Sequence, residues 1–286
     1  MAPDEQRGGG VRWRSIRVEG AEGATRDAII AALVALGAGG VQEEGAALLT
    51  YLPADTDLAP LDAAASEATP AVRIETRDLG EVDWASMWST RVEAHRLGRI
   101  AVAPPWLAEE VADAEHVVLV DPAMAFGTGE HPTTRGVIRL MQGIVRDGDV
   151  VADLGAGSAV LSIAAAKLGA RRVYAIEMDP DAIGNAEENV ARNGVADRVH
   201  VLHGDASLIL PLVAPVRVVL ANIISSVLVA LSPVMRGALL PGGSAIISGI
   251  LRTERDDLLD ALAADGWVLR DEDAEGEWWS AVISQR

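Results

Sequence analysis

The sequence predicts an α/β protein in which helices cover both faces of a parallel β-sheet, preceded by a small α+β unit. From residue 117 onward, short apolar segments alternate with longer helical ones, the rhythm of a parallel sheet. Residues 11–78 instead show the element order β-α-β-β-α-β. Half of the 286 residues are apolar and only 3% are aromatic, so alanine, valine and leucine must fill most of the core.

The N-terminal unit is predicted to be ferredoxin-like from its element order. Thr25 can cap its first helix, and Gly37 can end that helix. We expect strands over 11–18, 41–43, 46–52 and 72–76, and helices over 25–36 and 61–67.

The segment after this unit is predicted to be a linker. A helix is expected over 81–97, where Trp84 and Trp88 lie four residues apart on one face and favour packing. Two prolines at 104–105 then stop regular structure. The predicted domains are therefore 1–79, a linker over 80–106, and 107–286.

The larger domain is predicted from its alternating elements and its different end. Its last two strands, 267–269 and 278–284, follow each other without a helix and predict a terminal hairpin at a sheet edge. The other strands are expected at 117–120, 149–154, 172–177, 199–203, 216–221 and 244–248, with helices notably over 158–168, 180–193 and 226–239.

Composition excludes several classes of function. The chain has no cysteine, so disulfides and thiolate metal sites are excluded. Its formal net charge of −18 argues against direct nucleic-acid binding, which needs clustered lysine and arginine. The N-terminus has no apolar signal segment, and no apolar run is long enough to span a bilayer. We expect a cytoplasmic protein without membrane association.

A strand, a glycine turn and a helix are predicted in "VVADLGAGSAVLSIAAAKLGA". Gly155 and Gly157 would let the backbone approach a ligand at the carboxyl end of the sheet. Glu177 ends the next strand, where a carboxylate can bind both hydroxyls of a ribose. This pattern indicates a nucleoside-containing ligand.

Two residues help to decide which ligand that is. A dinucleotide fingerprint needs glycine or alanine at position 160, where this chain has Val160, which argues against a nicotinamide dehydrogenase. Asp153 would repel a pyrophosphate but suit the ammonium and sulfonium of S-adenosylmethionine. The alternative for Asp153 is a strand-end residue that bonds the amides of its own turn, and both interpretations stay open.

Asn222 ends the apolar strand in "VVLANIISSVL", at the same expected edge as Gly155 and Glu177. Methyltransferases that act on planar amino groups often follow this position with two prolines and an aromatic residue. Here Ile223 and Ile224 follow, with nothing to stack on a planar group. A flexible sp³ amine therefore fits better as the methyl acceptor.

With these motifs the chain resembles the ribosomal protein L-eleven methyltransferase family, PrmA. The resemblance covers nearly the whole chain, most weakly over residues 1–75, and "AFGTG-x-HPTT" is its most specific part. The matching segments are "DPAMAFGTGEHPTTRG", "DLGAGSAVLSIAAAKLGA", "IEMDPDAIGNAEENVARNGV", "LANI", "LLPGGSAIISGIL" and "EGEWWS".

The resemblance implies a Rossmann-like class I methyltransferase with a seven-stranded sheet and S-adenosylmethionine as methyl donor. It implies repeated methylation of lysine side chains and the α-amine of one ribosomal protein, which the N-terminal domain binds. Family precedent also favours a monomer. A different methyltransferase on the same fold, or a binding module that has lost its chemistry, remain the alternatives.

Carried over from the family, the donor contacts fall on Thr134, Gly155, Glu177 and Asn222, with Asp153, Gly157 and Phe126 as additions. Asn222 would orient the amine, and no dedicated base and no metal are expected. The chain departs from the family pattern in having Glu177 for aspartate, Ala159 for glycine, and Ile-Ser-Ser-Val after the residue that follows Asn222.

The resemblance also gives a meaning to the glycine-rich stretch before the core. It has no lysine for a phosphate loop, and Arg135 stands where a zinc helix starting at His131 would need a second histidine. We expect Gly127 and Gly129 to let this stretch fold over the donor. Thr134 would face the methionyl end of the donor from the first turn of the following helix.

Overall fold

The computed structural model describes residues 12–21, 23–38, 41–44, 47–66, 72–81, 93–121 and 129–286. The chain falls into two compact units, Met1–Thr90 and Arg91–Arg286, and each is described by itself. No helix in the described ranges is long and apolar enough to cross a membrane.

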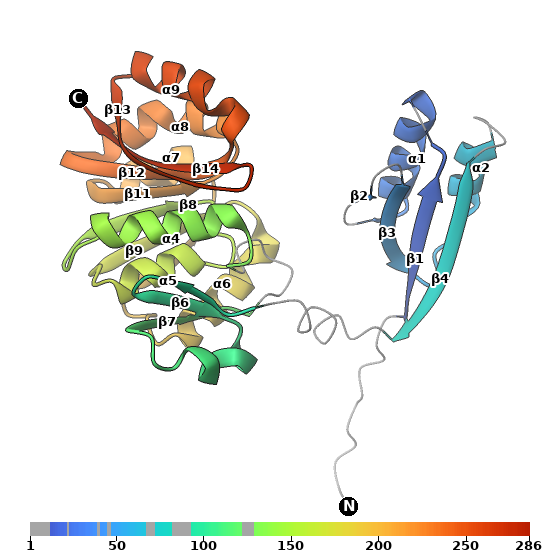
Figure 1. Cartoon of the computed structure of the whole chain (residues 1–286), viewed down its shortest axis with the longest axis horizontal. Coiled ribbons are helices and arrows are strands. Elements are labelled where there is room, and N and C mark those ends of the chain that lie inside the picture. Colours follow the sequence, from blue (N-terminus) through green and yellow to red (C-terminus); the bar gives the residue numbers. More distant parts are fainter. Residues whose placement is uncertain are drawn as a thin grey trace, which may run out of the picture. The chain divides into compact units, whose positions relative to one another are not determined.

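The first unit has the predicted order of elements, with two helices on a four-stranded antiparallel sheet (Figure 1). The strand order is β2-β3-β1-β4, which is the ferredoxin-like arrangement. Ile16, Val18, Leu48 and Leu52 alternate along β1 and β3 and are fully buried with residues of both helices. The elements are β1 Arg12–Glu19, α1 Gly23–Ala35, β2 Gln42–Glu44, β3 Ala47–Pro53, α2 Ala59–Ser66 and β4 Arg73–Glu81.

The helix predicted over 81–97 is wrong at both of its described ends. Glu81 is the last residue of β4, and β5 covers His95–Leu97. Residues 82–92, which include both predicted packing tryptophans, lie outside the described residues. β5 pairs with β6 (Ile100–Ala103), which pairs with β7 (His116–Leu119) across a short 3-10 segment, η1 (Pro105–Val111).

This three-stranded sheet corrects a second expectation. The strand predicted at 117–120 belongs to it and not to the large sheet. The run Ile100–Ala103 is completely buried, and four residues directly before two prolines gave too short a pattern to predict a strand.

The seven-stranded sheet predicted for the second unit is confirmed, with strand order β10-β9-β8-β11-β12-β14-β13. Its strands run parallel except β14, which pairs antiparallel with both neighbours and forms the predicted edge hairpin with β13. The strands are β8 Val150–Leu154, β9 Arg172–Glu177, β10 Val199–His203, β11 Val216–Asn222, β12 Leu239–Leu251, β13 Trp267–Glu275 and β14 Trp278–Gln285.

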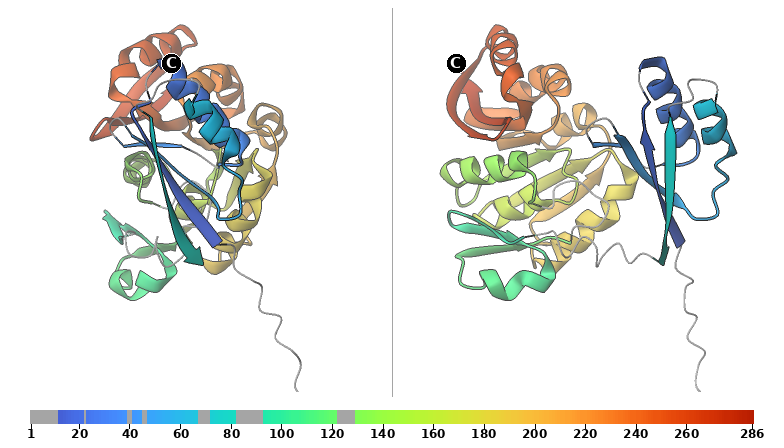
Figure 2. Two further views of the ribbon diagram at one scale, coloured as in Figure 1. Left: turned by 90° about the vertical axis from the view of Figure 1, so that its right-hand side faces the viewer. Right: turned by 45° about the vertical axis from the view of Figure 1, so that its right-hand side comes forward.

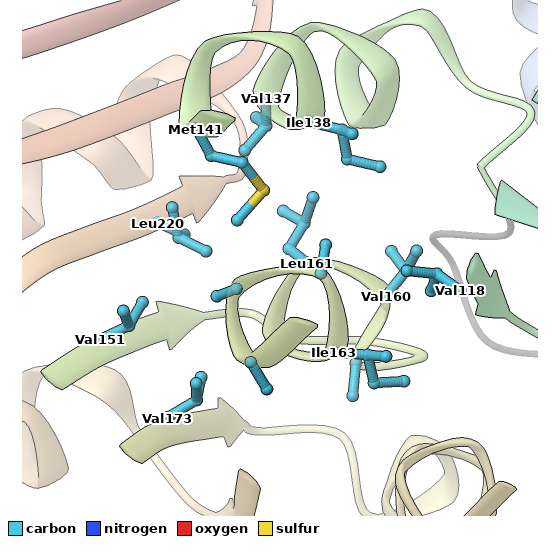
Figure 3. Packing of buried hydrophobic residues seen from close by; sticks show 14 of the residues in the cluster. Val118, Val137, Ile138, Met141, Val151, Val160, Leu161, Ile163, Val173 and Leu220 are labelled. Atoms are coloured by element: carbon cyan, nitrogen blue, oxygen red, sulfur yellow. The ribbon is translucent and has the colours of Figure 1, made fainter. Parts of the chain in front are cut away.

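Helices cover both faces of this sheet (Figure 2). On one face, Val137 and Met141 of α4 pack with Leu161 of α5 against Val151 and Leu220 of the sheet (Figure 3). A second cluster fills the other face under α7, α8 and α9. The helices are α4 Pro132–Ile144, α5 Val160–Lys167, α6 Pro180–Arg192, α7 Ala206–Val213, α8 Ser225–Ala238 and α9 Arg255–Ala264, which follows a 3-10 turn, η2, at Arg252–Glu254.

The strand order reverses at β8. From β8 the chain builds outward through β9 to β10, and it then returns to place β11 on the other side of β8. The loops that follow β8 and β11 therefore lead to helices on opposite faces of the sheet, α5 and α8. In open α/β sheets this point, at the carboxyl ends of the strands, is where ligands bind.

Candidate functional site

The glycine loop between β8 and α5 lies at this reversal point. Gly155 has φ 69° and Gly157 has φ 52°, which are conformations that favour glycine. A Cβ on Gly155 would also lie 2.9 Å from Cγ2 of Ile223, in the loop after β11. The loop is held to the sheet because the N–H groups of Gly155 and Ala156 both donate to Ile176 O. Only glycine suits position 155.

Ala159 ends the glycine loop in a left-handed conformation, with φ 64° and ψ 17°. It is the only non-glycine residue with a positive φ among the described residues. An L-residue there carries a backbone cost that glycine avoids. The family's usual glycine at this position, noted above as a departure, has this physical reason.

Glu177 ends β9 directly beside the glycine loop. Its Oε2 accepts from Gly157 N at 2.8 Å, and its Oε1 accepts from the N–H groups of Met178 and Asp179 at 2.8 Å each. A carboxylate has about four lone-pair sites, so three are in use. The carboxylate can bind a diol through the remaining site, or by exchanging one of these backbone bonds.

Asp153 is buried beneath the loop, with its side chain 1% exposed. Ser162 Oγ donates to its Oδ2 at 2.7 Å, while Oδ1 has no hydrogen-bond partner among the described residues. Burial raises the pKa of this carboxyl to about 7, and the bonds from Ser162 only partly oppose the shift. Among the described residues, the hydrogen bonds of the Asp153 carboxyl come from Ser162 in α5 and not from the amides of its own turn. Its contact with the donor stays a prediction.

Thr134 and Asn222 meet although they are far apart in the sequence. Asn222 Nδ2 donates to Thr134 Oγ1 at 3.4 Å, which joins the end of β11 to the first turn of α4. Thr134 is fully buried. Asn222 Oδ1 is buried and accepts no hydrogen bond from any residue that the structure describes. Because unsatisfied buried acceptors are rare and costly, this oxygen is ready for a donor supplied by a ligand.

The N-terminus of α4 is fixed in place by polar contacts. His131 caps the helix, with Nδ1 2.7 Å from Thr133 Oγ1, and its ring packs edge-on against Trp278 with centroids 4.7 Å apart. Burial lowers the pKa of His131, and the charge of Arg135 lowers it further. Ser248 Oγ donates to Thr133 O at 3.2 Å. His131 is thus committed to capping and packing.

An ionic cluster holds α4 to the C-terminal hairpin. Arg135 lies 2.5 Å from Glu275, and Arg139 lies 2.5 Å from Asp273 and 2.9 Å from Glu275. A Cβ on Gly136 would lie within 2.4 Å of Ser280 Oγ, so helix and hairpin pack closely between these pairs. Sequence reasoning missed this cluster because its partners lie more than 130 residues apart.

The structure does not bring every predicted residue into the site. Phe126 and Gly127 lie outside the described residues. Asp205, which follows β10, caps α7 by accepting from Ser207 N at 2.7 Å. Sequence reasoning also missed Met178, which is 70% exposed beside Glu177 and offers an apolar surface there. Within the described ranges no three His, Asp or Glu side chains form a group that could hold a metal ion.

Comparison with known proteins identifies the family. Residues 13–286 match the family model for ribosomal protein L11 methyltransferase, PrmA. The chain belongs to this family. The PrmA assignment was expected from "AFGTG-x-HPTT" and is confirmed.

Individual PrmA relatives agree with this. A ribosomal protein L11 methyltransferase of Pelotomaculum thermopropionicum is 40% identical over 235 residues, covering 80% of this chain and 76% of the relative. One of Chloroflexus aurantiacus is 38% identical over 265 residues, covering 82% and 81%. The crystal structure of a ribosomal protein L11 methylase of Lactobacillus delbrueckii subsp. bulgaricus is 30% identical with a TM-score of 0.61, over 68% of this chain and 99% of that one. The chain is therefore a methyltransferase with the class I fold.

Proposed function

We propose that this chain transfers methyl groups from S-adenosylmethionine to amino groups of ribosomal protein L11, both lysine side chains and the N-terminal α-amine. Domain 1–79 would recognise the protein substrate, segment 80–106 would link, and domain 107–286 would carry out the chemistry. The names of the PrmA relatives support this substrate. Asn222 Oδ1 supports an N–H substrate most directly, because it is a buried acceptor without a partner in the described part of the chain.

The residues around the reversal of the strand order fit the donor. Gly155 and Gly157 allow close backbone approach, and Glu177 offers an oxygen to the ribose hydroxyls. Thr134, in the first turn of α4, would serve the methionyl end. Asp153 would support the donor indirectly. Its carboxylate accepts a hydrogen bond from Ser162 and would thereby help to maintain the conformation of the glycine loop.

Methyl transfer to an amine needs positioning more than acid–base catalysis. The bound donor supplies an electrophilic methyl group with a neutral leaving group. The reaction requires the amine nitrogen to approach the methyl group in line, within about 3–3.5 Å. Asn222 Oδ1 would accept an N–H of the incoming amine and so direct the lone pair of the amine nitrogen toward the methyl group. Asn222 Nδ2 stays on Thr134, which fixes the amide orientation.

Deprotonation of the amine follows from its surroundings. A lysine has a pKa near 10.4 in water, and a desolvated site next to a positive charge lowers it. Neutral Asn222 adds no charge that would hold the proton, and His131 is occupied as a helix cap. Water can therefore take the proton, and we propose no dedicated base.

The net charge of −18 suits a basic protein substrate. Electrostatic attraction between complementary surfaces raises association rates and is weakened by salt. Encounter with L11 should therefore slow as ionic strength rises. A rate of association that does not change with salt would refute this part of the proposal.

The test is transfer of tritiated methyl groups to ribosomal proteins purified from cells that lack the enzyme. We expect label in L11 alone, with mass spectrometry locating it on lysines and the α-amine. Lys167 is the only lysine of this chain, so self-labelling contributes little background. Asn222→Ala serves as the impaired control. Label in a different protein, or in none, would refute the proposed substrate.

A further inference from the structure

We propose that Asn189, in α6, is a positioning residue that fixes the glycine loop against the chain leaving β7, and through this contact sets the affinity for the methyl donor. The proposal rests on the proposed function, since the glycine loop is the part of the site that would hold the donor. Asn189 is fully buried in α6. Burial of a polar side chain lowers the stability of the fold unless its hydrogen-bonding groups find partners.

The amide of Asn189 bridges two segments that are distant in the sequence. Nδ2 donates to Ser158 O, in the glycine loop, at 3.2 Å, and Oδ1 accepts from Asp121 N, just beyond β7, at 2.9 Å. Two further contacts agree with this amide orientation. Arg192 donates to Oδ1 at 2.6 Å, and Asn185 Oδ1 accepts from Nδ2 at 3.3 Å.

The glycine loop needs such a contact because of its backbone. Gly155, Gly157 and Ala159 all have positive φ, and glycines have many accessible conformations. Glu177 holds the loop through Gly157 N at 2.8 Å. Asn189 holds it at the following residue, through the carbonyl of Ser158. Together the two side chains select one conformation for the donor to meet.

The other segment that Asn189 holds is the chain beyond β7. The Asp121 carboxylate also receives a contact from Arg192 at 3.4 Å, so α6 fixes both its backbone and its side chain. Asn189 thereby joins the loop that would hold the donor to the segment that leads toward α4 and Thr134.

Asn193, one turn along the same helix, provides a matched control. Its Nδ2 donates to Leu119 O at 2.7 Å and to Asn189 O at 2.8 Å, and its Oδ1 accepts from Leu119 N at 2.9 Å. It is 8% exposed and holds the same strand end. None of its hydrogen bonds among the described residues reaches the glycine loop.

The experiment compares Asn189→Asp with Asn193→Asp in the full chain. Each aspartate keeps the acceptor oxygen and loses the donor, and at position 189 this places an oxygen against Ser158 O. We expect the Kd for S-adenosylhomocysteine, measured by calorimetry well below the melting temperature, to rise about tenfold or more in Asn189→Asp, as for a buried acceptor left unpaired. Asn193→Asp should stay within about twofold of wild type.

Kinetics add a readout that a purely structural role would not move. In Asn189→Asp the KM for the donor should rise, while the KM for the ribosomal protein stays as in wild type. The positioning role would be overturned if Asn189→Asp lost stability but kept its affinity for S-adenosylhomocysteine. It would also be overturned if both aspartate variants bound S-adenosylhomocysteine equally more weakly than wild type. Should an aspartate variant not fold, Asn189→Ala and Asn193→Ala allow the same comparison. A wild-type chain that binds no S-adenosylhomocysteine would instead refute the proposed function.

Discussion

The amide of Asn222 donates a hydrogen bond to Thr134 Oγ1 across 88 positions of the sequence, at 3.4 Å. The bond leaves Asn222 Oδ1 as the other end of the amide, which is buried and has no partner within the described ranges. Because Thr134 is fully buried at the start of a helix fixed to the sheet, it restricts rotation of the amide. The orientation of the proposed amine acceptor thus depends on a residue that need not touch the amine.

This relationship predicts energetic coupling in methyl transfer. Asn222→Ala removes the acceptor, and Thr134→Val removes the bond that orients it while keeping the side-chain shape. Each should lower kcat/KM for the protein substrate, and the double variant should lose less than the sum, with a coupling energy of about 0.5–3 kcal/mol. A double-mutant cycle on initial rates measures it. Additive losses would show that the two residues act independently.

Much of the site could be predicted because its elements are local. Gly155 is required by its turn, Glu177 ends a strand of the parallel sheet, and Asn222 ends another, so their meeting follows from the rule that parallel strands share a carboxyl edge. The helix start at Pro132 follows from the preference of proline for the first helical turn. These inferences needed only strand ends and turn chemistry.

The remainder depends on contacts that sequence spacing does not encode. Asn189 looks like an ordinary polar residue of an amphipathic helix, and only the fold shows that it is buried between two loops. The pairing of His131 with Trp278 requires the edge hairpin to reach α4. For Asp153 the sequence left two interpretations open, a contact with a cation or bonds to its own turn amides, and neither pattern indicated the bond from Ser162 in the next helix.

Ala159 should tolerate glycine and reject valine. Its left-handed conformation costs an alanine about 1–2 kcal/mol. Glycine removes this cost, but it loses a buried methyl of about 0.8 kcal/mol and adds about 0.4–1 kcal/mol of unfolded-state entropy. The terms nearly cancel, so Ala159→Gly should unfold within about 1 kcal/mol of wild type. Ala159→Val should be clearly less stable by urea unfolding. Equal stability of the glycine and valine variants would contradict the left-handed conformation of residue 159.

Glu275 should contribute stability that depends on pH. The hydrogen bond from Arg135 lowers its pKa, and Arg139 adds to the effect. Since the folded pKa lies below the unfolded one, the contribution is present above the ordinary glutamate range and is lost as pH falls through the lowered value. Glu275→Gln should cost about 1 kcal/mol at pH 7, discounted for partial exposure.

The matched control for Glu275 is Glu277→Gln in the same hairpin, where the side chain is exposed. Urea unfolding at pH 7 should separate Glu275→Gln from wild type and leave Glu277→Gln close to it. In strong acid the difference between Glu275→Gln and wild type should shrink, because both side chains are then neutral. A deficit that persists in acid would show that geometry, and not charge, holds the hairpin.

Asp153 should have the opposite dependence. Burial raises its folded pKa to about 7, well above the unfolded aspartate value of about 3.9. The folded state therefore binds the proton more tightly, and the stability associated with protonated Asp153 is complete below the unfolded pKa. It declines as pH rises from the unfolded pKa toward 7, by about 1.4 kcal/mol for each pH unit in that interval. Above pH 7 Asp153 is charged in both the folded and the unfolded state, so its contribution to stability no longer changes with pH.

Asp153→Asn tests this directly, because an amide retains the shape and an acceptor for Ser162 without a charge. Relative to wild type, the stability of the variant should rise between pH 5 and pH 7 and level off from pH 7 to pH 8, measured by urea unfolding at each pH. Asp205→Asn is the control, and it should lose stability where Asp153→Asn gains it. The reason is that hydrogen bonds from Ser207 lower the pKa of the exposed Asp205 carboxyl. If Asp153→Asn and wild type keep a constant difference across this range, Asp153 does not titrate there. Its Oδ1, which no described residue contacts by a hydrogen bond, must then be satisfied in solution by a group that keeps the carboxylate charged.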